Sequence, residues 1–338
     1  MDRAPFKPLL IAATLLLMAL GLAGGALPDR AVERAGPTDL GLYADAVQAA
    51  RHPLTWYPAV IAEQRAQGYP LKPFVAVRPP TLAFLLTALP DVAARRIALD
   101  LLALGVLVAW AVRLKAMLPP LGLGLAVFAV ATGLMPVLAG QAYLMHETWA
   151  GLLIALSLAL RRPGAFGWSL AVGFAAVLIR ELAAPYLVAM AVMALHERRR
   201  GEALAWAGAL IAFALMLGLH GWLVGLNTLP TDRHSQGWLA LGGWPFVLHA
   251  LQWNAVLAAG PGWLTAVLVP LALAGAAVSG GRLGLVVLGY VAALLVFGRP
   301  ENAYWGLVLT PLLPLGLVRL ATALARRPGE ARAWALAG

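Results

Sequence analysis

The stretch LAWAGALIAFALMLGLHGWLVG, residues 204–225, contains no Asp, Glu, Lys or Arg. An α-helix rises about 1.5 Å per residue, so such a run matches the bilayer's hydrocarbon core of about 30 Å. Its one titratable side chain is His220, for which we favour a packing role over a chemical one. The stretch therefore predicts a transmembrane helix.

The composition of the whole chain agrees with this interpretation. The 338 residues are 62% hydrophobic and 12% charged, whereas soluble domains contain about 25% charged residues. The chain has no cysteine, which excludes disulfides and thiolate metal sites. We predict an all-α, polytopic integral membrane protein, with residues 1–338 forming a single membrane domain.

Further apolar runs flanked by charge predict the other spans. The run from Ala165 to Leu195 contains Arg180 and Glu181 in its middle, so we interpret it as two short helices that meet at that pair. In total we expect about ten transmembrane helices, over residues 8–27, 97–113, 118–136, 147–160, 165–179, 183–196, 204–225, 262–279, 283–298 and 303–323.

The distribution of basic residues predicts the orientation. With both termini cytoplasmic, the inside holds the whole formal charge of +10 and the outside is neutral, as the positive-inside rule expects. Residues 244–260 contain His249, Gln252 and Asn254, and counting them as a span would place Arg282 outside. We therefore expect this segment to be interfacial or re-entrant.

The same distribution bears on partners and location. Basic residues stand at the ends of apolar runs, which favours membrane lipids as partners and argues against nucleic acid. We expect a bacterial inner (plasma) membrane protein. The first apolar run could belong to a cleaved signal peptide, but its length favours an uncleaved span.

Two external segments, residues 28–79 and 226–261, collect most polar side chains under this topology. The first contains PTDLGLYADAV, residues 37–47, where Thr38 or Asp39 can cap a helix that carries Tyr43. A second helix near residues 58–67, a proline-rich stretch and a short apolar helix follow. The aromatic content predicts a folded lid over the membrane surface.

These residues resemble the multi-span C-type (GT-C) glycosyltransferases, which use polyprenyl-phosphate-linked sugars. The resemblance covers residues 8–325 approximately. It rests on short motifs: Asp39-x-x-x-Tyr43, Trp56-Tyr57, Gly68-Tyr69-Pro70, Arg78-Pro79-Pro80 before a half-helix, Gly140-Gln141 before a span, Arg180 interrupting a span with Pro185 after it, and a basic stop at Arg198.

The resemblance implies a site between the first external loop and the outer leaflet, with an acid of that loop as general base. Asp39 matches that position, and Asp45 is the reserve candidate. Leu40 stands where several relatives carry a second acid, which argues against a metal bound by a carboxylate pair. We assign no metal ligands and expect no cofactor. The expected substrate-binding residues are Tyr43, Arg78, Gln141, Arg180, Glu181 and Arg299.

Elementary chemistry supports the same assignment. Sugar transfer from a lipid phosphate to a hydroxyl requires a carboxylate near the acceptor and cations where the phosphate departs. Asp39 would supply the first, and Arg78, Arg180 or Arg299 the second. We expect an enzyme that transfers a sugar from a polyprenyl-phosphate donor to a lipid or glycan acceptor, with inversion implied by the family mechanism. The alternatives are a transporter or flippase, another glycan-processing enzyme such as a polymerase or ligase, and a non-catalytic membrane component.

Overall fold

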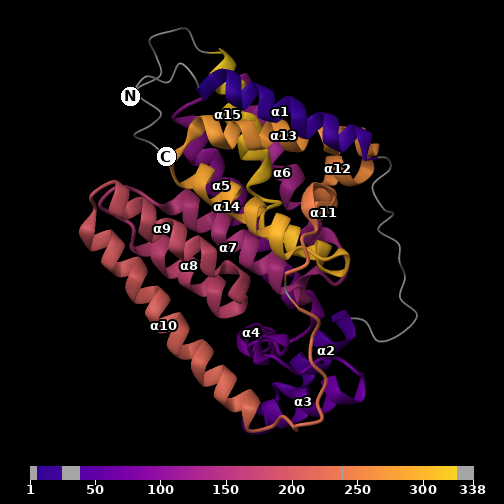
Figure 1. Cartoon of the computed structure of the whole chain (residues 1–338). Helices are drawn as coiled ribbons and strands as arrows, with labels where there is room; N and C mark the ends of the chain where they lie inside the picture. The colour runs from indigo at the N-terminus through magenta and orange to yellow at the C-terminus, as the bar shows by residue number, and fades with distance from the viewer. Residues whose placement is uncertain (1–5, 25–38, 238, 326–338) are drawn as a thin grey trace.

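The computed structural model describes residues 6–24, 39–237 and 239–325, and over this part of the chain it is all-helical, with no strand. Its longer helices occupy the predicted apolar runs (Figure 1). They are α1 (Phe6–Ala23), α5 (Val92–Lys115), α6 (Pro120–Leu134), α7 (His146–Leu160), α8 (Gly167–Ile179), α9 (Ala184–His196), α10 (Arg200–Gly225), α13 (Gly262–Ser279), α14 (Gly281–Phe297) and α15 (Leu313–Ala325).

Four helical segments of the described chain are long and apolar enough to cross a membrane: Val92–Lys115, Pro120–Leu138, Arg200–Gly225 and Gly262–Ser279. A fifth candidate is the pair Pro300–Val308 and Leu313–Ala325, whose axes are bent by 60°. The remaining helices in the predicted ranges are shorter. The membrane character thus rests on four or five helices, and the count of ten spans stays a prediction.

The segment predicted to be interfacial or re-entrant is broken into short pieces. Helix α11 (Gly243–Ala250) continues through η6 (Leu251–Trp253) to α12 (Ala255–Ala259). Asn254 interrupts the run because its backbone is extended while its Oδ1 accepts a hydrogen bond from Val256 N at 3.0 Å. The Asn254 side chain thus provides an acceptor for the first N–H groups of α12, which lie in an otherwise apolar stretch.

Helices α2 (Asp39–Ala49), α3 (Trp56–Ala66) and α4 (Thr81–Thr87) form a group at one end of the molecule (Figure 1). The Trp56 indole is almost fully buried and donates from Nε1 to Ala46 O at 3.1 Å, which ties α3 to α2. Thr87 Oγ1 donates to Val47 O at 2.7 Å and ties α4 to the same helix. The predicted lid is therefore folded from residue 39 onward; residues 28–38 lie outside the described part.

The lid is joined to the first part of the second polar segment, residues 226–237. Arg65 Nε donates to Asp232 Oδ1 at 2.6 Å, and the N–H groups of Leu71 and Lys72 both donate to Arg233 O. Helix α10 also contacts the lid: His220 bonds to the Tyr57 hydroxyl at 2.9 Å and to Val77 O at 2.9 Å. Two segments far apart in sequence thus form one cover, and His220 has the packing role expected of it.

At the other end of the molecule, α13 packs between α1 and α15 (Figure 1). The 3-10 helix η7 (Pro300–Val308) lies against α11 at Gly306, where a Cβ atom would overlap the Ala250 carbonyl oxygen. Only glycine permits this approach of two backbones. The contact fixes η7 at the border between the helical body and the lid.

Candidate functional site

A cavity of about 470 Å³ lies between the lid, residues 233–236 and η7. Its volume falls within the range of about 300–1,000 Å³ that is usual for small-molecule sites. Tyr69, Trp56 and Leu82 contribute apolar surface. The polar side chains that line it are Asp39, Tyr43, Gln64, Tyr69, Arg78, His146, Arg233, His234, Ser235, Gln236, Arg299, Glu301, Asn302 and Tyr304.

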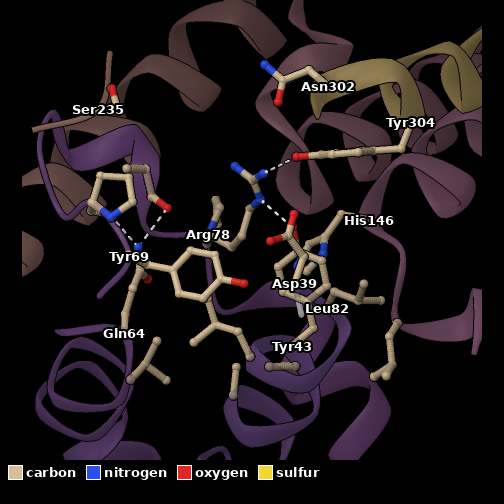
Figure 2. Close-up of a pocket in the computed structure, with 18 of the residues that line it drawn as sticks. Asp39, Tyr43, Gln64, Tyr69, Arg78, Leu82, His146, Ser235, Asn302 and Tyr304 are labelled. Atoms are coloured by element: carbon tan, nitrogen blue, oxygen red, sulfur yellow. Dashed lines mark hydrogen bonds between the residues drawn. The ribbon is translucent and has the colours of Figure 1, made fainter. Parts of the chain in front are cut away.

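Arg78 is held in the wall of the cavity by two phenols. Its Nε donates to the Tyr43 hydroxyl and its Nη2 to the Tyr304 hydroxyl, both at 3.4 Å (Figure 2). Burial raises the pKa of the Tyr43 phenol above its ordinary value, so the phenol is neutral at physiological pH. The two hydroxyls that accept hydrogen bonds from Arg78 are therefore uncharged.

Asp39 is the first residue of α2 and lines the same end of the cavity. Figure 2 shows Asp39, Arg78 and Tyr304 gathered on one side of the cavity and Gln64 and Ser235 on the other. Asp39 is half-buried. A carboxylate and a guanidinium thus reach one cavity from separate elements.

An ion-pair network lies directly behind Arg78. Arg180 Nε donates to Glu147 Oε1 at 2.6 Å, and both side chains are almost completely buried. Arg180 also pairs with Glu181, whose Oε1 lies 3.9 Å from Arg78 Nη1. The network supports Arg78 from behind, and Arg180 itself does not line the cavity.

The structure separates the predicted site residues into groups. Asp39, Tyr43, Arg78 and Arg299 line the cavity, and Arg299 lies 3.7 Å from Glu301. Asp45 is exposed on α2, outside the cavity lining, and accepts a hydrogen bond from Gln67 Nε2 at 3.1 Å. Gln141 is also exposed and does not contribute to the lining. Arg180 and Glu181 form the network described above.

Three kinds of lining residue were not predicted. Tyr304 lies in the polar segment before the last apolar run, close in sequence to Arg299. This position could have identified it as a site residue. The His146 ring lies 4.8 Å from the Tyr43 ring, centroid to centroid. Tyr69 belongs to the Gly68-Tyr69-Pro70 motif but was not assigned to the site, and Gln64 and Ser235 come from lid and loop positions that show no motif.

No protein-family model, curated protein or solved structure matches the chain. The resemblance to GT-C glycosyltransferases therefore stays a prediction, and the cavity is the feature of the molecule that bears on its function.

Proposed function

We propose that the chain is a membrane glycosyltransferase that moves a sugar from a polyprenyl-phosphate-linked donor to a hydroxyl of a lipid or glycan acceptor. The observation behind this proposal is that one cavity contains both the Asp39 carboxylate and the Arg78 guanidinium. These are the two charges that the reaction requires at its opposite ends.

In this reaction Asp39 accepts the proton of the acceptor hydroxyl as its oxygen bonds to the anomeric carbon. The bond between that carbon and the phosphate oxygen breaks, and the phosphate leaves with the bonding electrons. Arg78 binds the departing phosphate, since arginine donates two parallel hydrogen bonds to phosphate oxygens. Attack opposite the phosphate would invert the anomeric centre.

The surroundings of Arg78 favour this role over a purely structural one. Among the described residues, its hydrogen-bond partners are neutral hydroxyls at 3.4 Å, which is long for a charged donor, and the nearest carboxylate oxygen lies 3.9 Å away. Arg180, by contrast, bonds to two carboxylates and lies outside the lining. We therefore assign the phosphate to Arg78 and the support of Arg78 to Arg180.

The test is transfer activity in the Asp39→Asn variant, reconstituted with a polyprenyl-phosphate sugar and a pool of membrane lipid and glycan acceptors. Loss of the base should lower the rate by at least about 100-fold, the usual contribution of general base catalysis. Asp100→Asn is the matched control, because Asp100 is exposed on α5 and distant in sequence from the lid. Unfolding temperatures of both variants should match that of the unmodified protein.

Asp45→Asn separates the two candidate bases, since Asp45 lies on the same helix but outside the cavity. Full activity of Asp39→Asn would reject the assignment. If the unmodified protein moved a labelled lipid-linked sugar across liposome membranes and formed no glycosidic product, the flippase alternative would replace it.

A further inference from the structure

A second group of arginines surrounds a small pocket of about 20 Å³ at the C-terminal end of α7. Since α7 has 15 residues, this end lies about 22 Å from Glu147 and the candidate site. The pocket is lined by Trp110, Arg113, Leu158, Arg161, Ser279, Gly280, Arg282, Leu283 and Arg319. Four guanidiniums thus line it, and within the described chain no Asp or Glu does.

The carboxylates near this pocket bond to its arginines but do not line it. Arg161 donates to Glu202 at 2.9 and 3.1 Å and to Glu197 at 2.8 Å, and Arg282 bonds to the same two carboxylates. Arg113 Nη1 donates to three backbone oxygens at 2.9–3.2 Å, which are neutral acceptors. Within the described chain these carboxylates are not part of the pocket lining, whereas the four guanidiniums are.

The backbone adds positive potential at the same point. Helix α14 begins beside the pocket, and its N-cap residue, Gly280, has a positive φ of 57° and supplies no side-chain cap. The first N–H groups of a helix carry a partial positive charge and attract anions. In addition, Arg282 is almost fully buried, and its Nε has no hydrogen-bond partner among the described residues.

We propose that this arginine pocket binds one anionic oxygen of a phosphate group, presented either by an anionic lipid head group or by free phosphate. The pocket volume admits about one oxygen-sized atom, because a buried water needs roughly 10–15 Å³. Gly280 is exposed and marks the opening of the pocket, so the rest of the phosphate group remains outside. This site is independent of the proposed sugar transfer.

The experiment compares the unfolding temperature of the full chain in three settings: phosphatidylcholine nanodiscs, the same nanodiscs with inorganic phosphate, and nanodiscs that contain phosphatidylglycerol. Binding to the folded state alone should raise the unfolding temperature by about 3 °C or more. A rise in the phosphatidylglycerol arm alone identifies the lipid as the source. A rise with inorganic phosphate as well shows that the free ion is sufficient.

Arg319→Gln and Arg113→Gln should each remove most of the rise. Arg162→Gln should retain it, since Arg162 is exposed, follows Arg161 directly and does not line the pocket. Equal loss in all three variants would mean diffuse surface attraction and would overturn the proposal.

If a pocket variant fails to fold, native mass spectrometry of the unmodified protein provides the second measurement. It should retain one phosphatidylglycerol or one phosphate after exchange into neutral detergent. Retention of neither, with no rise in unfolding temperature, would also overturn the proposal.

Discussion

The two ends of α7 carry two clusters of arginine and glutamate that differ in balance. At the N-terminal end, Glu147 and Glu181 face Arg180 and Arg78, so that charges are equal in number. At the C-terminal end, two carboxylates bond to buried arginines around a pocket lined by four guanidiniums. The first cluster adjoins a cavity of about 470 Å³ and the second a pocket of about 20 Å³.

The difference teaches that residue type alone does not define a reaction site. In our proposal the N-terminal cluster forms part of a reaction site because Arg78 lines a cavity large enough for a sugar phosphate. Two neutral phenols and a separate carboxylate, Asp39, line the same cavity. The C-terminal cluster lacks that space and excludes carboxylates from its lining within the described chain. It is suited to binding a small anionic group, as proposed above, and to holding the ends of helices in place.

The largest effect should follow from Arg180→Ala, which leaves the Glu147 carboxylate buried without its cation. Removing one partner of a buried pair costs about 3–5 kcal/mol, so we expect a loss of about 4 kcal/mol in the free energy of unfolding. Denaturation of the purified protein measures it. Arg96→Ala is the control, since Arg96 bonds to Gly140 O in an exposed position. A loss below 1 kcal/mol would contradict the buried network.

A loss of about 3 kcal/mol is expected for Glu202→Gln in the C-terminal cluster, because Glu202 bonds to two buried arginines. The variant also makes the arginine pocket more positive. Inorganic phosphate should therefore raise its unfolding temperature more than it raises that of the unmodified protein, which scanning calorimetry would measure. A smaller rise would show that Glu202 helps to form the anion site instead of competing with it.

Tyr304→Phe removes one of the two phenols that orient Arg78. The hydrogen bond is long at 3.4 Å, so its loss should cost less than about 1 kcal/mol of stability. If the proposed function is right, KM for the lipid-linked donor should rise several-fold while the acceptor KM stays the same. Steady-state kinetics with each substrate varied in turn would separate the two, and equal changes would argue against a phosphate role for Arg78.

The smallest effect concerns the ion pair that joins the lid to the second polar segment. The hydrogen bond from Arg65 lowers the pKa of Asp232 from 3.8 to about 2. Because the folded pKa is the lower one, the stabilisation is present above pH 4 and is lost as the pH falls toward 2. Asp232→Asn should abolish this part of the pH dependence, as measured by unfolding temperatures across that range. An unchanged profile would mean that the pair is too exposed to matter.

The helices could be predicted from sequence because apolar runs report them directly. Helix α13 has the predicted bounds, 262–279, and the break at Arg180 separates α8 from α9 as expected. Helix α5 begins five residues before its predicted start, because Asp91 caps it through Ala94 N. The charged residues that follow, Arg95 and Arg96, lie at half-buried and exposed positions.

The site could be predicted only in part. Asp39, Tyr43 and Arg78 belong to short local motifs, and the structure brings them to one cavity. The pairing of Glu147 with Arg180 spans 33 positions, and no local pattern specifies such a contact. Tyr304 approaches Arg78 from 226 positions away, which only the packing of η7 determines.

The contact between Gly306 and Ala250 has a consequence for Tyr304, which lies two residues earlier in η7. Because Gly306 has no side chain, η7 packs directly against the backbone of α11. This close packing sets the position of η7 and hence how far the Tyr304 phenol extends toward Arg78. A randomised codon at position 306 should therefore yield functional clones with glycine alone. A methyl group at position 306 would then push η7 away from α11 and displace the Tyr304 ring.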